Sequence, residues 1–141
     1  MAKKLLPTQA THKVAESEKI TINLGFVDLG QIDLLVAEHF YGNRSDFIRT
    51  AIRNQLAQHA DAVQQAVARK TLVLGLAHFS ASDLRAVQAA QHKLRIRVLG
   101  LATIASDVSP ELALATIESI DVLGGLQASP AVKAALATLP R

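Results

Sequence analysis

The sequence of 141 residues contains no cysteine, which excludes disulfides, thiol catalysis and thiolate metal sites. It also has no signal-peptide pattern and no apolar run of eighteen or more residues, so a soluble cytoplasmic protein is expected. No nucleophile is grouped with a base and an orienting acid, and there is no P-loop or dinucleotide-binding motif. The five histidines are scattered and lack the neighbours that a metal site needs. An enzyme, a metal site and a cofactor are therefore not expected.

The excess of positive over negative charge is also small. Lys and Arg number 15 against 12 Asp and Glu, for a net charge of +3. The excess is spread evenly, with nine basic against seven acidic residues in 1–70 and six against five in 71–141. This mild bias is compatible with nucleic acid, but without a polybasic tract any affinity for DNA would come from the geometry of a dimer.

The hydrophobic content of 50% allows a sizeable core, and the length suggests two small domains. Residues 1–17 carry scattered lysines among small polar residues and are predicted to form a flexible arm.

Residues 18–24 alternate between apolar and polar side chains, which predicts a short strand. One face holds Ile20, Ile22 and Leu24, and the other holds Lys19, Thr21 and Asn23. A two-stranded ribbon is not stable alone and this segment offers only one strand, so a second copy of the chain is the simplest donor of the other.

A helix-like apolar run follows the strand and leads to a turn and a second helix. In the turn, Asn43 can cap this helix, and Asp46 can return a bond to the amide of the cap in a variant of the capping box. The amides of Arg44 and Ser45 then lie at a positive helix terminus, which suits an anion.

The strand Ile20-Thr-Ile-Asn-Leu24, followed by Gly42-Asn-Arg-Ser-Asp-Phe-Ile-Arg49, resembles the ribbon-helix-helix regulators of the MetJ/Arc/CopG class. The resemblance covers residues 18–58 and implies a swapped antiparallel ribbon, with one strand from each subunit, that enters the major groove of double-stranded DNA. It implies base reading by Lys19, Thr21 and Asn23, and phosphate binding by Asn43, Arg44 and Ser45. The homodimer core would contain Ile20, Ile22, Leu24, Phe47, Ile48 and Ile52.

Apolar residues continue at helical spacing beyond this unit, so residues 59–70 are predicted to be a helical connector. Either one long helix or a broken pair of helices fits the pattern. A domain boundary is expected at about residue 70.

Residues 71–141 contain an internal repeat. The segments Val73–Ala77, Val98–Ala102 and Val122–Leu126 place glycines at 75, 100 and 124, a period of 25 and then 24 residues. A helix-start signal follows each segment, at Ser80, Ser109 and Ser129. The helices are predicted at 81–92, 110–118 and 130–138. Strands joined by such helices should lie parallel, so a βαβαβα unit with a three-stranded parallel sheet is expected and the fold class is α/β.

The predicted sheet has two different faces. One face consists of small apolar residues and suits close packing of helices. It holds Val73, Gly75, Ala77, Val98, Gly100, Ala102, Val122 and Gly124. The other face is rich in leucine and should meet another subunit or the long helix, because a parallel sheet is normally covered on both sides. Its leucines are Leu72, Leu74, Leu76, Leu99, Leu101 and Leu123. In this register Arg97 lies beside Asp121, where the two can pair.

Two functions fit these features. The first is a sequence-specific transcriptional regulator, a repressor, that acts as a dimer or higher oligomer, with residues 71–141 serving oligomerisation or sensing an effector. An antitoxin is a variant of it, weakened by the folded C-terminal half. The second is a DNA-associated assembly or partition protein whose C-terminal repeats self-associate. Selective binding to particular DNA sequences would separate them.

Overall fold

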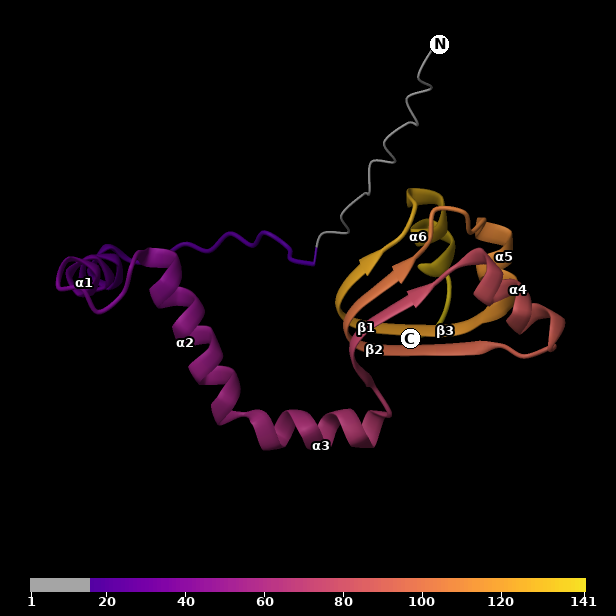
Figure 1. The fold of residues 1–141 in the computed structure, drawn as a ribbon, viewed down its shortest axis with the longest axis horizontal. Coiled ribbons are helices and arrows are strands. Elements are labelled where there is room, and N and C mark those ends of the chain that lie inside the picture. Colours follow the sequence, from indigo (N-terminus) through magenta and orange to yellow (C-terminus); the bar gives the residue numbers. More distant parts are fainter. Residues whose placement is uncertain (1–15) are drawn as a thin grey trace, which may run out of the picture.

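The computed structural model describes residues 16–141, so the predicted arm at 1–17 lies outside the described residues except for its last two positions. Three helices come first and a βαβαβα unit follows (Figure 1). The helices are α1 (Phe26–Ala37), α2 (Arg44–Gln58) and α3 (Ala60–Lys70). The unit comprises β1 (Val73–Phe79), α4 (Ala81–Ala89), β2 (Leu94–Ile104), α5 (Pro110–Thr116), β3 (Ile117–Gln127) and α6 (Pro130–Leu136).

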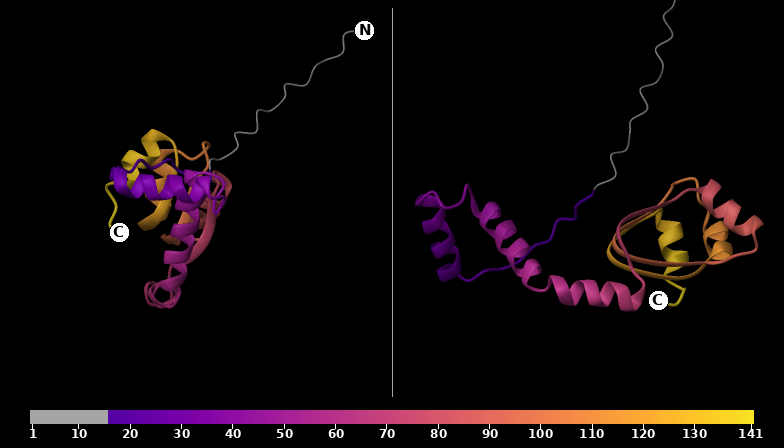
Figure 2. Two further views of the ribbon diagram at one scale, coloured as in Figure 1. Left: turned by 90° about the vertical axis from the view of Figure 1, so that its left-hand side faces the viewer. Right: turned by 60° about the horizontal axis from the view of Figure 1, so that its bottom comes forward.

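The three strands form one parallel sheet in the order β1-β2-β3, as the repeat predicts. Gly75 pairs with Gly100, and Gly100 with Gly124, so the predicted register is confirmed. The strands are longer than the repeat suggested, because β2 begins at Leu94 and β3 at Ile117. Figures 1 and 2 show the strands curving around α5 and α6.

The predicted caps start all three helices of this unit. The Ser80 hydroxyl accepts the amide of Asp83, whose carboxylate accepts the amide of Ser80 in a complete capping box. The hydroxyls of Ser109 and Ser129 accept the amides of Leu112 and Val132 and so cap α5 and α6, each of which has a proline at its first helical position. The helices end two or three residues earlier than predicted, at 89, 116 and 136.

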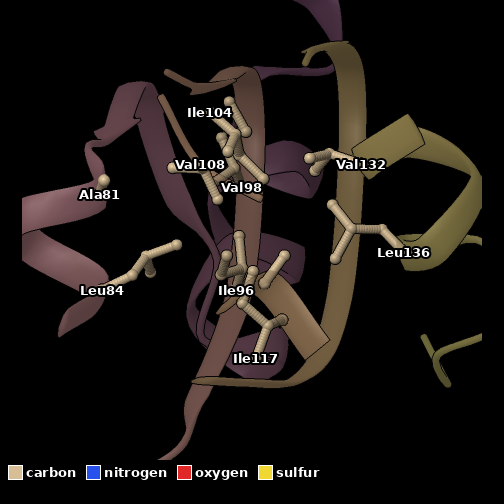
Figure 3. Packing of buried hydrophobic residues seen from close by; sticks show 11 residues of the cluster. Ala81, Leu84, Ile96, Val98, Ile104, Val108, Ile117, Val132 and Leu136 are labelled. Carbon is tan, nitrogen blue, oxygen red and sulfur yellow. The ribbon is translucent and has the colours of Figure 1, made fainter. Parts of the chain in front are cut away.

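The hydrophobic core lies between the sheet and these helices. Figure 3 shows Leu84 of α4, Val98 of β2 and Val132 of α6 within one cluster, and each is at most 2% exposed. The cluster consists of Ala81, Leu84, Ile96, Val98, Ala102, Ile104, Val108, Ala113, Ile117, Val132 and Leu136. The face of β2 that was expected to pack against helices therefore does so.

The three aligned glycines form a column, Gly75, Gly100 and Gly124, that has a different role from the expected close packing of helices. Each has a positive φ, at 120°, 142° and 122°. A Cβ atom on Gly100 would lie 2.1 Å from the carbonyl oxygen of Gly75, and one on Gly124 would lie 2.1 Å from that of Gly100. The column thus lets the backbones of neighbouring strands approach where no larger residue fits.

Two predicted positions on the sheet faces need correction. Leu72 precedes β1 and is buried, so it does not belong to the exposed leucine face. Val73 is 57% exposed, because β1 is an edge strand with a neighbour on one side only.

The register places Arg97 beside Asp121 as predicted, but the Arg97 guanidinium donates to the carbonyl of Lys70 at 3.0 Å.

The connector is a broken pair of helices. His59 is the C-cap of α2 and also the residue before α3, and the helical pattern is interrupted there. Figure 1 shows the chain changing direction between α2 and α3. The continuous helix, which was the other alternative, is therefore excluded.

Residues 16–25 form neither helix nor strand within a single chain. They run as an extended trace before α1 in Figure 1. This differs from the predicted strand for a physical reason, since a strand assignment needs a hydrogen-bonded neighbour and the prediction places that neighbour in a second subunit.

Candidate nucleic-acid interface

The extended segment before α1 presents the three polar side chains of the predicted reading face. Lys19, Thr21 and Asn23 are all exposed. Within residues 16–141, no hydrogen bond or ion pair engages any of the three side chains. Their donors and acceptors are therefore available to a ligand.

The apolar side chains of the same segment lack a full cover. Ile20 is 73% exposed, Ile22 56% and Leu24 37%, so exposure falls as the chain approaches the helices. Ile22 and Leu24 line a hollow of about 540 Å³ together with Leu29 of α1 and Ile48 of α2. One side of the segment thus faces α1 and α2, and its apolar residues are only partly buried by them.

The side chains of α1 and α2 are also poorly buried. Ile32 is the only buried residue of α1 and α2. Of the other predicted dimer-core residues, Phe47 and Ile48 are half-buried and Ile52 is 47% exposed. Further large apolar side chains exposed on or beside these helices are Phe26, Val27, Leu34, Phe40 and Leu56. A single chain therefore does not supply a core for this unit.

The N-terminus of α2 is built by side chains of the preceding turn. The Asn43 amide oxygen accepts the backbone amide of Asp46 at 2.8 Å, which confirms Asn43 as the cap. The Asp46 carboxylate accepts the amide of Gly42 at 2.9 Å and not that of Asn43. Asp46 was expected to accept the amide of Asn43 in a variant of the capping box. This expectation is wrong, because Asp46 accepts the amide of the residue before Asn43, Gly42.

The amides of Arg44 and Ser45 lie in the first turn of α2, where a helix has no internal acceptor for its amides. Such amides, at the positive end of the helix dipole, can donate to an anionic oxygen. Asn43, Arg44 and Ser45 are all exposed, so this terminus is accessible.

The Arg44 side chain is engaged elsewhere. Its guanidinium makes a two-pronged contact with the Asp33 carboxylate of α1, at 2.7 and 2.8 Å. The hydrogen bond from Arg44 lowers the pKa of Asp33, and the same bond raises the pKa of Arg44. This pair joins α1 to α2 and leaves the Arg44 backbone amide, not its side chain, to meet an anion.

Sequence reasoning missed this ion pair and one aromatic contact. The rings of Tyr41 and Phe47 lie edge to face, with centroids 5.0 Å apart. Asp33 and Arg44 are eleven residues apart, and no periodicity connects them. Tyr41 and Phe47 lie on either side of the Asn43 cap in the sequence. Their six-residue spacing across a turn matches no helix or strand period, so the sequence did not predict this contact.

Among residues 16–141, no three or more His, Asp or Glu side chains gather closely enough to hold a metal ion. No helix in the same part of the chain is both long and apolar enough to cross a membrane.

The profile of the Ribbon-Helix-Helix transcriptional regulator family matches residues 15–133. The chain therefore belongs to this family. The match extends well beyond residues 18–58, where the sequence motifs lie, and includes the three repeats. Neither the curated proteins nor the solved structures contain a match to the chain.

Proposed function

We propose that the protein is a sequence-specific DNA-binding regulator, a repressor, that binds as a dimer through residues 18–58. The observation that carries this proposal is the division of the extended segment into two kinds of side chain. Ile20 and Ile22 lack cover in a single chain, whereas Lys19 and Asn23 are exposed and unpaired among the described residues. Membership of the family supports the same reading.

In the proposed dimer, residues 18–24 of the two subunits pair as an antiparallel ribbon. Pairing satisfies the backbone groups that face each other across the ribbon and covers Ile20, Ile22 and Leu24 against the helices. The opposite face of the ribbon enters the major groove, which is wide enough for two strands.

The polar side chains suit base recognition. Asn23 can bond bidentately to adenine N6 and N7, Lys19 can donate to guanine O6 and N7, and Thr21 can bond to a base or contact a thymine methyl group. The first-turn amides of α2, at Arg44 and Ser45, bind a DNA phosphate and set the register of the ribbon. The Asp33–Arg44 contact supports this role by holding α2 against α1.

Residues 71–141 are proposed to self-associate. Leu74 and Leu76 are each 70% exposed and Leu123 is 47% exposed, while Leu99 and Leu101 of the central strand are half-buried. The pairing register places Leu74, Leu99 and Leu123 side by side, so the apolar surface crosses all three strands. An uncovered face on a parallel sheet is expected to be covered by another subunit.

Selection of bound fragments from genomic DNA by the purified full-length protein tests the proposal. Enrichment of a common motif with two half-sites is expected for a dimeric regulator. Binding that depends on salt but not on sequence would instead favour the second function, a DNA-associated assembly or partition protein. The exposed leucine face of the sheet also fits this second function, because an assembly protein requires residues 71–141 to self-associate.

A further inference from the structure

Within the part of the chain that the structure describes, the sheet has two edge strands, β1 on one side and β3 on the other. An edge strand presents unpaired backbone amides and carbonyls, and proteins usually protect such edges with charged side chains, prolines or a covering segment. The β1 sequence Val73–Phe79 contains no proline and no Asp, Glu, Lys or Arg. The second half of β3, residues 122–127, has none of them either.

The first half of β3 is protected. It carries Glu118 and Asp121, and the carbonyl of Pro140 accepts the amide of Ile120 at 3.1 Å. The chain after α6 therefore lies against this part of the strand. Residues 122–126 of β3 align through β2 with residues 73–77 of β1, and within residues 16–141 no strand pairs with either stretch on its outer side. The open parts of the two edges are thus the same part of the repeat.

The exposure of β1 is that of a strand with a missing neighbour. Val73 is 57% exposed, whereas Val98, its counterpart in the central strand, is 2% exposed. On the other face Leu74 is 70% exposed, whereas Leu99 is half-buried between Leu74 and Leu123. Another strand beside β1 would reduce the exposure of its side chains toward the values seen in β2.

The glycine column defines the register in which a further strand would pair with β1. Gly100 lies against the carbonyl of Gly75, and Gly124 lies against the carbonyl of Gly100. The corresponding space at Gly75 is empty, since no atom of residues 16–141 lies within 4 Å of the position of a Cβ. The carbonyl that would occupy this space in a continued stack is that of Gly124 in another molecule.

We propose that β3 of one chain pairs in parallel with β1 of a second copy, so that Val122 and Leu123 lie beside Val73 and Leu74 of that copy. The sheet then continues from chain to chain. The two surfaces are different, so the contact does not close on itself and builds open arrays. This pairing rests on the proposed self-association of residues 71–141 and does not depend on DNA binding.

Two single-cysteine variants of the full-length protein test the pairing, since the natural chain has no cysteine. Leu74→Cys and Leu123→Cys place thiols on exposed edge positions. Neighbouring strands are about 4.8 Å apart, within the roughly 4.4–6.8 Å that disulfides span between Cα atoms. The expected product of mild oxidation is a disulfide between positions 74 and 123, formed in the mixture of the two variants and identified by mass spectrometry of the linked peptides.

Leu114→Cys is the matched control, because Leu114 is a 40% exposed leucine on α5, away from both edges. Docking raises the local thiol concentration toward roughly the millimolar range, so linkage between 74 and 123 should exceed linkage to position 114 by about tenfold or more. Equal linkage to both would overturn the proposal. Preferential linkage of either edge variant to itself would also overturn it, because that result requires like edges to meet.

A charge at the edge gives a second readout. Leu74→Lys should lower the mass of the assembly in solution, measured by light scattering, while Leu114→Lys leaves it unchanged. Unchanged mass for Leu74→Lys would count against edge pairing and leave the proposed DNA binding untouched. Conversely, disulfide formation between 74 and 123 in a protein that binds no DNA would retain edge pairing and remove the proposed regulator.

Discussion

At the scale of single residues, base recognition depends on a few exposed side chains. We expect Asn23→Ala to weaken binding to a selected operator by about 1–3 kcal/mol, if Asn23 makes a bidentate contact with adenine, and to leave binding to random duplexes nearly unchanged. Fluorescence anisotropy at constant salt would measure both. Asn54→Ala, on the exposed surface of α2, is the matched control. Equal losses on operator and random DNA would exclude base reading by Asn23.

The glycine column gives a second test at this scale. Gly100→Ala should destabilise the protein strongly, because the added Cβ would meet the Gly75 carbonyl oxygen and because φ is 142°. Gly30→Ala is the control, since Gly30 lies inside α1 and none of the described atoms beyond its own helix lies within 4 Å of its Cβ position. That change should stabilise the helix by about 1 kcal/mol. Chemical denaturation would compare the two, and equal stability of both variants would show that the column tolerates side chains.

At the scale of elements, the Asn43 cap joins helix stability to DNA binding. Asn43→Ala should reduce stability by about 1 kcal/mol and also weaken phosphate binding at the start of α2. Ser109→Ala removes the equivalent cap of α5 and should cost a similar amount without affecting DNA affinity. Thermal melting and DNA titration of both variants would check this. A loss of DNA affinity in Ser109→Ala would mean that general destabilisation explains the effect of the Asn43 change.

The elements also show how much could be predicted from the sequence. Ser80, Ser109 and Ser129 were identified as helix starts because a cap acts through its own backbone neighbours. The parallel sheet and its register followed from the 24- and 25-residue period. These features are local or repetitive, so a sequence pattern suffices to find them.

Other features depend on contacts that no local pattern records. The Asp33–Arg44 pair joins two helices across an irregular turn, and the glycine column brings together backbones that lie far apart in the sequence. The start of β2 at Leu94 lies outside the repeated motif and was missed for that reason, although Arg95 and Arg97 alternate with buried residues as in a strand. The ribbon itself cannot form in one chain, so a single subunit contains only its unpaired half.

At the scale of the whole molecule, folding of the N-terminal unit should require a second subunit. Leu74→Lys is the suitable background, because it removes the proposed edge pairing and leaves residues 18–58 intact. In this variant the melting temperature should rise with protein concentration, since dissociation accompanies unfolding. Calorimetry over a wide range of concentrations would measure the shift. A melting temperature independent of concentration, with monomeric sedimentation, would exclude a ribbon shared between two chains.

The glycine column also bears on how proteins of this kind can change in length. Each repeat meets the next through the same backbone contact, and stacks of equivalent repeats behave as nearly one-dimensional systems. Duplicating residues 98–121 after Asp121 should therefore add one strand while preserving both edges, and the product should still unfold cooperatively. A scrambled insertion of the same length is the control and should lower the unfolding midpoint. Gene duplication could thus lengthen the sheet one module at a time, so that descendants with different numbers of modules retain the same ribbon and the same two ends.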